Sequence, residues 1–244
     1  MSITLWSTRV QGSGKTARLL NSCLTVVLIL IMDGWIRAAA ALGGIPIELP
    51  AAYKHYVDNT KPEFLAKFPH GKIPGLETAD GFKLFESVAI ARYVAALAPD
   101  SGLLGKDLKE SALVDQWIHL AESEIDLYTS LIGNLIRGVI SPYSKAIHTT
   151  FAQRQLRALQ TLNTHLASHT FFVGERITLA DIHVAMIIQR TTWVTFDAPL
   201  RKQLNHLVRH LETIINQPLF RDIFTPVAYV EKALGYMPPK KDVK

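Results

Sequence analysis

Short stretches of alternating apolar and polar positions fill the early part of the chain, and this pattern predicts β-strands. Residues 3–6 alternate as a strand does, and residues 45–49 form a second candidate in which Pro46 indicates a sheet edge. Residues 73–77 and 82–85 flank an Asp-Gly turn and therefore predict a β-hairpin. Helices are expected between and after these strands, so the first part of the chain is predicted to be a small mixed α/β domain.

Glycine and proline positions set the ends of the expected helices in this domain. The chain looks helical from Lys15, and residues 37–42 followed by two glycines are typical of a helix end. Pro62 begins a short helix, a position that suits proline because the first helical N–H has no partner. Residues 87–97 are alanine-rich and stop before Pro99, which predicts the last helix of the domain.

Residues 19–35 interrupt this pattern and are interpreted as an anomalous insertion. The centre, residues 25–31, is β-branched and apolar on every side, and Asp33 with Gly34 offers a turn. Three interpretations stay open: a long first helix, an inserted strand, or a segment that the mature protein lacks. The apolar run is too short to span a bilayer, which requires about 20 residues, so no membrane segment is expected.

Only helical periodicity remains after residues 99–105, which have the composition of a linker. The expected helices are residues 109–137 with a break near Gly133, 143–168, 178–195, 200–216 and 218–233. Thr178 and Asp181 form a capping box at the start of the third helix, because each side chain is placed to bond a free backbone N–H. The second part of the chain is therefore predicted to be all-helical.

Composition favours a soluble, ordered protein of a reducing compartment. The 244 residues are 48% hydrophobic and 19% charged, which excludes an intrinsically disordered chain. Cys23 is the single cysteine and the N-terminal sequence lacks a signal-peptide layout, so a cytoplasmic protein without disulfides is expected. The net charge is +5, but the basic residues form no dense run except the tail at residues 240–244, so no nucleic-acid partner is expected.

Two patterns that point to other chemistries are incomplete. Residues 12–16 read Gly-Ser-Gly-Lys-Thr as in a phosphate-binding loop, but Arg9 stands where that loop requires a glycine. Two histidine pairs have the spacing of helical metal ligands: His165 with His169, and His206 with His210. No third ligand accompanies either pair, so no metal site is expected, and these histidines are predicted to lie at the surface or in an interface.

Several longer motifs resemble the cytosolic glutathione transferases, and in detail the glutathione-transferase-like region of translation elongation factor 1 gamma subunits. The matching stretches are residues 64–69, 71–74, 80–87, 115–117, 121–125 and 174–182. The likeness covers nearly the whole chain except residues 19–35. It implies a thioredoxin-like N-terminal domain over residues 1–98, a linker over 99–105 and an all-helical C-terminal domain over 106–244.

The resemblance implies a site for glutathione as substrate or cosubstrate. The residues that match are Asn59, Lys72, Ile73, Pro74, Glu86 and Ser87. The matching proline is cis in the family, so Pro74 is expected to turn the Ile73 backbone towards the cysteinyl part of the tripeptide. Ser87 is expected to take the γ-glutamyl carboxylate and Glu86 its amino group, while Lys72 or Asn59 reaches the glycyl carboxylate.

A free thiol has a pKa of about 8.5, and this pKa must be lowered to give thiolate at neutral pH. The resemblance therefore also implies a hydroxyl or amide group that donates a hydrogen bond to the sulfur. The candidates in the loop after the first strand are Ser13, Gln11, Ser7 and Thr8. Ser13 is favoured, although this loop departs from the usual pattern of the family. Cys23 is interpreted as a buried, inert thiol because it lies inside the apolar insertion.

Three functions follow from the resemblance. The first is an enzyme that adds glutathione to a small electrophile, or reversibly to a conjugated enone so that it acts as a cis/trans isomerase, in detoxification or secondary metabolism. The second is a non-enzymatic module like that of elongation factor 1 gamma, and the third is a scaffold that has lost the site. A homodimer is the family expectation. Four aromatic residues line an acceptor pocket or simply pack in the core: Trp117, Tyr128, Trp193 and Phe196.

Overall fold

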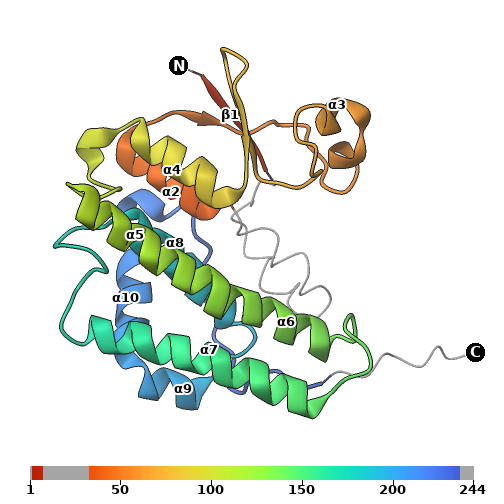
Figure 1. Cartoon of the computed structure of the whole chain (residues 1–244), viewed down its shortest axis with the longest axis vertical. Coiled ribbons are helices and arrows are strands. Elements are labelled where there is room, and N and C mark those ends of the chain that lie inside the picture. The colour runs from red at the N-terminus through yellow and green to blue at the C-terminus, as the bar shows by residue number, and fades with distance from the viewer. Residues whose placement is uncertain (1, 8–32, 237–244) are drawn as a thin grey trace, which may run out of the picture. The chain divides into compact units, whose positions relative to one another are not determined.

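The computed structural model describes residues 2–7 and 33–236, which divide into two compact units (Figure 1). The first unit comprises residues 1–106 together with 216–225, and the second comprises residues 107–215 together with 226–244. The first contains all strands of the described chain, and the second is helical. This arrangement confirms the predicted fold class, a mixed α/β domain followed by a helical one.

The sheet of the first unit has four strands in the order β2-β1-β3-β4. The strands are β1 (Ile3–Trp6), β2 (Ile47–Glu48), β3 (Gly75–Thr78) and β4 (Lys83–Phe85). β1 runs parallel to β2 and antiparallel to β3, which pairs antiparallel with β4. The predicted hairpin is therefore confirmed. The strand predicted at residues 45–49 shrinks to two residues at the sheet edge, where Pro46 cannot donate to the ladder.

Side chains of β1 alternate between two environments, as its sequence pattern indicates. Ile3 and Leu5 are fully buried, whereas Trp6 on the opposite face is half-buried. The Trp6 ring packs edge-on against Phe64 of α3 (Pro62–Leu65), at 5.9 Å between ring centroids. Apolar packing thus covers both faces of this strand.

Two helices of the first unit, α2 (Gly34–Gly43) and α4 (Ser87–Ala96), pack against each other. α2 ends at Gly44, whose φ of 64° is the left-handed cap predicted from the two glycines. A short 3-10 helix, Pro218–Phe220, packs on α2, and the Arg37 guanidinium donates to the Asp222 carbonyl at 3.3 Å. These contacts explain why residues 216–225 belong to the first unit although the sequence assigns them to the helical domain.

The helices of the second unit are α5 (Leu108–Ala121), α6 (Leu127–Ile136), α7 (Lys145–Leu166), α8 (Leu179–Thr191), α9 (Ala198–Gln203) and α10 (Asn205–Ile215). α8 is its centre, because every residue of α8 is buried and α5 and α10 both pack against it. α5 and α6 are joined by a π-helical segment, Glu122–Asp126. The Arg190 guanidinium of α8 is hydrogen-bonded to Asp126 in that segment. The predicted break near Gly133 is wrong, since α6 continues to Ile136.

Two further helix predictions are wrong at the C-terminal end. Residues 200–216 are split at Leu204, and α10 begins afterwards with its Leu207 N–H bonded to the Asn163 side chain of α7 at 3.1 Å. Of the helix predicted over residues 218–233 only the 3-10 turn Pro218–Phe220 forms, and some N–H groups after it bond to distant residues. The Val230 N–H, for example, donates to the Thr192 carbonyl at 2.9 Å. These partners are distant in sequence, so local periodicity does not reveal them.

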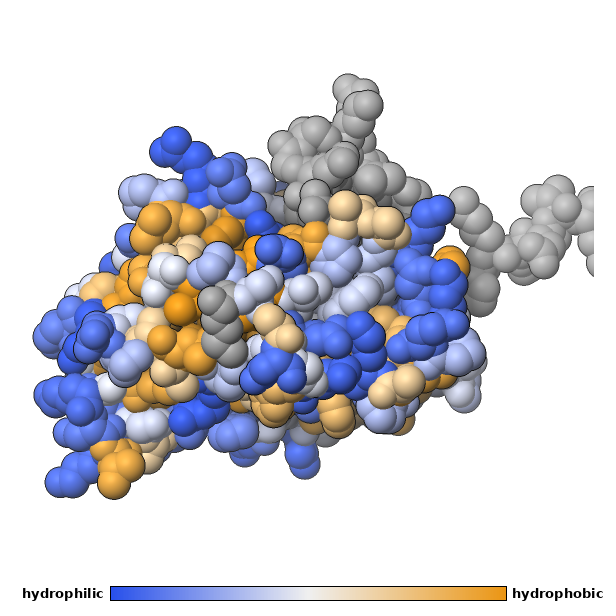
Figure 2. All heavy atoms as spheres, turned by 90° about the horizontal axis from the view of Figure 1, so that it is seen from above, coloured by the Kyte–Doolittle hydropathy of each residue, from blue (hydrophilic) through white to orange (hydrophobic). Residues whose placement is uncertain are grey.

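Several large apolar side chains of the first unit reach the surface. The most exposed are Tyr56, Leu219, Val57, Phe85 and Phe82. Figure 2 shows apolar residues gathered on the face seen from above, between charged ones. Across residues 2–7 and 33–236, no helix has both the length and the apolar content needed to cross a membrane.

Candidate functional site

Three adjacent strands bring the predicted site residues to one end of the sheet. Trp6 at the end of β1 lies opposite Gly75 at the start of β3, and Gly75 lies opposite Phe85 at the end of β4. Ser7, Pro74 and Glu86 are the next residues along their strands. The register therefore places all three at the same end of the sheet, although they are far apart in sequence.

The loop before β3 presents main-chain groups at this end. The Ile73–Pro74 peptide bond is cis, which confirms the prediction for Pro74. Pro74 is buried and Ile73 half-buried. Among the backbone bonds of the described residues, none uses the N–H or C=O of Ile73. Both groups are thus available to an extended peptide, which binds such backbone edges through paired hydrogen bonds.

Asn59 supports this loop through its side chain. Its side chain is only 7% exposed, and its Nδ2 donates to the Gly71 carbonyl at 2.7 Å. Gly71 has a φ of 63°, and an added Cβ would lie 3.3 Å from the Asn59 carbonyl oxygen. Asn59 therefore holds the turn before Lys72, and its binding of a glycyl carboxylate stays a prediction. Lys72 itself is exposed and makes no ion pair with any residue that the structure describes.

Glu86 has an unusual backbone at the head of α4. Its φ is 72° and its ψ is 119°, a region that residues with a side chain rarely adopt. Such conformations cost on the order of 1–3 kcal/mol and persist where the surrounding structure fixes them, often at binding sites. The Glu86 carbonyl accepts the Ile90 N–H at 3.0 Å, so the residue is part of the helix start. Its side chain is exposed and free of hydrogen bonds to other described residues.

Ser87 is the first residue of α4, and no side chain caps this helix. The first N–H groups of a helix have no partner inside the helix, and they carry a partial positive charge. Ser87 is half-buried and adds a hydroxyl to these amides. This helix start is therefore suited to a carboxylate, and Glu86 beside it is suited to an amine.

Ser7 is the one candidate for thiol activation that the structure describes. It is 3% exposed, and its hydroxyl is hydrogen-bonded to the Asp33 side chain. Burial raises the pKa of Asp33 to about 6, although the Arg37 charge and the Ser7 bond lower it. The Ser7 hydroxyl is therefore already engaged. Thr8, Gln11, Ser13 and Cys23 lie outside the described residues.

Sequence reasoning missed an aromatic cavity in the first unit. A cavity of about 710 Å³ is lined by Trp6, Pro50, Ala51, Ala52, Tyr53, Lys54, Val57, Asp58 and Lys61. The Trp6 Nε1 is buried without a hydrogen-bond partner among the described residues, and burial together with Asp58 raises the pKa of Tyr53 to about 12. Trp6 and Tyr53 give the cavity an aromatic lining, and Lys54, Asp58 and Lys61 give it charged groups. The sequence did contain one indication of this cavity: Trp6 is a large aromatic residue at a position of β1 where the alternation predicts a polar side chain.

The aromatic residues proposed for an acceptor pocket belong to the core of the second unit. Trp117, Tyr128, Trp193 and Phe196 are all at most 8% exposed. Trp117 packs on Phe172 with 5.1 Å between ring centroids, and Tyr128 packs on Phe151 at 5.6 Å. Of the two interpretations left open by the sequence, core packing is the one observed.

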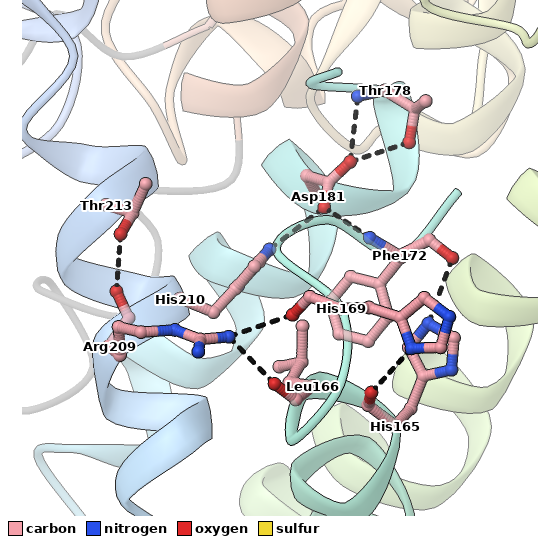
Figure 3. A network of polar contacts seen from close by, with 9 residues as sticks. All are labelled: His165, Leu166, His169, Phe172, Thr178, Asp181, Arg209, His210 and Thr213. Carbon is pink, nitrogen blue, oxygen red and sulfur yellow. Dashed lines mark hydrogen bonds and ion pairs between the residues drawn. The ribbon is translucent and has the colours of Figure 1, made fainter. Parts of the chain in front are cut away.

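The capping box at α8 is present and belongs to a larger buried network (Figure 3). Asp181 accepts bonds from the Thr178 N–H and hydroxyl and from the Phe172 N–H, all at 2.8 Å. His210 is fully buried and its Nε2 lies 3.0 Å from Asp181 Oδ1. The expectation of a surface position is therefore wrong for His210. His169 is exposed, and its ring stacks on His165 at 4.2 Å.

A resident metal finds little support in the described residues. Residues 2–7 and 33–236 contain no group of three or more His, Cys, Asp or Glu side chains placed to hold an ion. The chemistry offered by the sheet end is that of a polar peptide cradle.

Comparison with known proteins agrees with this geometry. Residues 35–96 match the family model for the glutathione S-transferase N-terminal domain, and residues 136–218 match the model for its C-terminal domain. The crystal structure of the GST-like domain of elongation factor 1-gamma from Saccharomyces cerevisiae has a TM-score of 0.73 and 23% identity, covering 98% of this chain and 99% of that chain.

Curated relatives are of two kinds. The Glutathione S-transferase-like protein LUC7 of Fusarium sp is 39% identical over 194 residues, covering 78% of this chain and 87% of that protein. The probable elongation factor 1-gamma 1 of Arabidopsis thaliana is 37% identical over 194 residues, covering 79% of this chain, which spans 46% of that longer protein. The two domain models match a part of each half of the chain, and the relatives match most of its length. The chain therefore belongs to the glutathione S-transferase family.

Proposed function

We propose that this protein binds glutathione at the described sheet end and activates its thiol for addition to a small electrophile. The observation that carries the proposal is that three features lie at the same end of the sheet. Glu86 has a φ of 72°, the start of α4 has no side-chain cap, and the Ile73 main chain makes no hydrogen bond to other described backbone groups. Glutathione is an extended tripeptide with two carboxylates and one amine, and this end offers a complement to each part.

Each part of the tripeptide has a partner in this proposal. Ile73 exchanges main-chain hydrogen bonds with the cysteinyl residue, as in strand addition. Ser87 and the first amides of α4 take the γ-glutamyl carboxylate, and Glu86 takes the amino group. Lys72, exposed and without an ion pair in the described part of the chain, takes the glycyl carboxylate.

Catalysis requires a donor to the sulfur from the loop that follows β1. Ser13 remains the favoured residue, with Gln11, Ser7 and Thr8 as alternatives. Ser7 is the weakest of these, because Asp33 already holds its hydroxyl. The thiol proton is lost to solvent, and the thiolate adds to the electrophilic carbon of a polarised double bond. A C–S bond forms as the π bond breaks, and its electron pair passes to the neighbouring atoms, which take up a proton from solvent. With a conjugated enone, reversal of this addition after bond rotation gives cis/trans isomerisation.

A transferase-like role is supported by the names of two relatives. Two fungal relatives carry the description glutathione S-transferase-like protein, LUC7 and the Gibberella fujikuroi protein FUS3, the second 35% identical over 199 residues. This chain covers 93% of the FUS3 protein. We propose a role in a biosynthetic or detoxification pathway on this basis.

A second candidate function is an interaction module like that of elongation factor 1 gamma. The similarity to the plant proteins and to the yeast GST-like domain favours it. In either case we propose a homodimer, because Phe82 and Phe85 expose 44% and 45% of their surface around β4, and a partner subunit would cover them.

Calorimetric titration of the full chain with glutathione tests the binding proposal directly. Saturable binding supports it, and an absence of heat and of retention on immobilised glutathione contradicts it. A screen with glutathione against electrophiles and conjugated enones tests catalysis separately. Binding without turnover, together with capture of elongation-factor subunits from an extract, favours the interaction module.

A further inference from the structure

The aromatic cavity of the first unit adjoins the end of the sheet to which glutathione is assigned. We call it the Trp6 cavity and define it by Trp6 together with the residues of the loop 50–61 that line it. Its volume of about 710 Å³ lies in the range of small-molecule sites, about 300–1,000 Å³. The whole cavity belongs to the first unit, and none of the glutathione contacts assigned above uses it.

Two contacts connect this cavity with the loop before β3. On one side, Trp6 is the register partner of Gly75, the first residue of β3. On the other side, Asn59, whose neighbour Asp58 lines the cavity, donates to the Gly71 carbonyl at 2.7 Å. The loop begins at this glycine and ends at β3, so both of its ends are tied to the cavity wall.

The order of the glutathione contacts leads toward the cavity. In the proposed complex the γ-glutamyl end lies at Ser87, the cysteinyl residue at Ile73 and the glycyl carboxylate at Lys72. From the cysteinyl to the glycyl residue the tripeptide moves back along the loop, toward Gly71 and the Asn59 side chain that joins it to the cavity wall. A group attached to the glycyl carboxylate therefore continues in the direction of the cavity.

Two aromatic rings form a corner of the cavity. The Trp6 and Tyr53 rings have centroids 6.1 Å apart and an interplanar angle of 78°, and both residues are half-buried. Phe64 of α3 holds both of them, at 5.9 Å from the Trp6 ring and 6.0 Å from the Tyr53 ring. A third ring that stacks on one wall of such a corner meets the other wall edge-on, and aromatic pairs prefer these two geometries.

The charged groups of the cavity leave one positive charge for a ligand. Two lysines, Lys54 and Lys61, line it together with one carboxylate, Asp58. That carboxylate accepts a bond from Lys61 Nζ at 2.7 Å. Lys54 is exposed and makes no ion pair with any side chain in the described part of the chain. Its ammonium group is therefore open to a carboxylate.

We propose that this protein binds γ-glutamylcysteinyl peptides that are one aromatic residue longer than glutathione. The first three residues occupy the glutathione end, and the added aromatic side chain packs in the corner of Trp6 and Tyr53. The new terminal carboxylate pairs with Lys54. This class of substrate rests on the proposed binding of glutathione, because both ligands use the same end of the sheet.

Calorimetric titration of the full chain with three reduced peptides tests the proposal: glutathione, γ-Glu-Cys-Gly-Phe and γ-Glu-Cys-Gly-Gly. The phenylalanyl peptide should bind roughly tenfold more tightly than glutathione, the scale of burying one aromatic side chain. The peptide that ends in a second glycine has the same length and no ring. It should bind about as tightly as glutathione, because it exchanges one exposed ion pair for another.

Two variants locate the added residue. Ala52 is an exposed residue of the cavity lining, so Ala52→Trp fills the cavity. This variant should lose the tenfold preference and bind glutathione as the unchanged chain does. Lys54→Met should weaken the phenylalanyl peptide roughly threefold and reduce the dependence of its binding on salt, as expected of an exposed ion pair.

Ala79→Trp is the matched control, because Ala79 is exposed in the hairpin turn and does not line the cavity. It should keep the preference. Thermal unfolding of each variant separates loss of the site from loss of the fold, and Ala51→Trp gives a second test if Ala52→Trp unfolds.

The outcomes separate this substrate class from glutathione binding itself. A phenylalanyl peptide that binds no more tightly than glutathione overturns the longer-peptide proposal and leaves the proposed function intact. A tenfold preference that persists in Ala52→Trp places the ring elsewhere and also overturns it. An absence of binding by all three peptides contradicts the proposed function as well.

Discussion

The starts of α4 and α8 differ in how their free amides are satisfied. At α8, Thr178 and Asp181 form a closed capping box that is buried and joined to His210. At α4, Glu86 makes no side-chain cap, has a positive φ and leaves the amides open. We call the capped start of α8 sealed and the uncapped start of α4 open. A sealed start stabilises the fold, whereas an open start leaves its N–H groups available to an anionic ligand.

The sealed start should show the largest effect on stability. Asp181→Ala leaves His210 and the Phe172 and Thr178 amides without their shared acceptor, and we expect a loss of about 3–5 kcal/mol in the free energy of unfolding. Urea denaturation measures this loss. Asp197→Ala, which removes the cap of the short helix α9, is the control and should cost about 1 kcal/mol. Equal losses would mean that the buried network adds nothing.

A buried histidine of α8, His183, predicts that stability depends on pH. Burial lowers the pKa of His183 to about 3, even though the Glu122 carboxylate lies 3.6 Å away. The unfolded chain therefore binds a proton that the folded chain excludes, and stability falls as the pH drops below about 6.5. His183 by itself contributes a loss of roughly 3 kcal/mol between about pH 7 and pH 4. The raised pKa of Asp33 offsets part of this loss, because the folded carboxyl takes up a proton at a higher pH than the unfolded one.

Comparison of variants isolates this histidine. His183→Gln should flatten the acid limb of the stability profile, whatever its effect at neutral pH. His70→Gln, at an exposed position, should leave the limb as it is. An unchanged slope in His183→Gln would show that other groups carry the acid sensitivity.

The open start should affect binding and spare stability. Ser87→Ala removes a hydroxyl that we assign to the γ-glutamyl carboxylate, so glutathione affinity should fall by roughly 1–3 kcal/mol. Calorimetric titration measures the change. Ser2→Ala, at the opposite end of β1, is the matched control and should bind normally. Equal affinity in both variants would remove Ser87 from the site.

Glu86 gives a small effect on stability that is opposite in sign to its effect on binding. Glycine adopts a positive φ without steric cost, so Glu86→Gly should raise the free energy of unfolding by up to about 1 kcal/mol while glutathione affinity falls. Ala89→Gly, inside α4, should instead lower it by about 1 kcal/mol. A loss of stability in Glu86→Gly would mean that its side chain supports the fold.

Several features of both units could be predicted because their signals are local. The Asp-Gly hairpin, the glycine that ends α2 and the capping box of α8 each depend on neighbouring residues. The wrong predictions share the opposite property. The helix start after Leu204 and the non-helical segment at residues 225–236 involve hydrogen bonds to Asn163 and to Thr192, which are distant in sequence.

The sequence by itself determined the motifs of the site: the Ile73-Pro74 pair, the Glu86-Ser87 pair and the helix that follows. Tertiary structure decided that these pairs meet at one sheet end, that Asn59 holds the loop, and that His210 is buried with Asp181. The physical reason is that a motif is read along the chain, whereas strand register and burial depend on residues brought together only by folding.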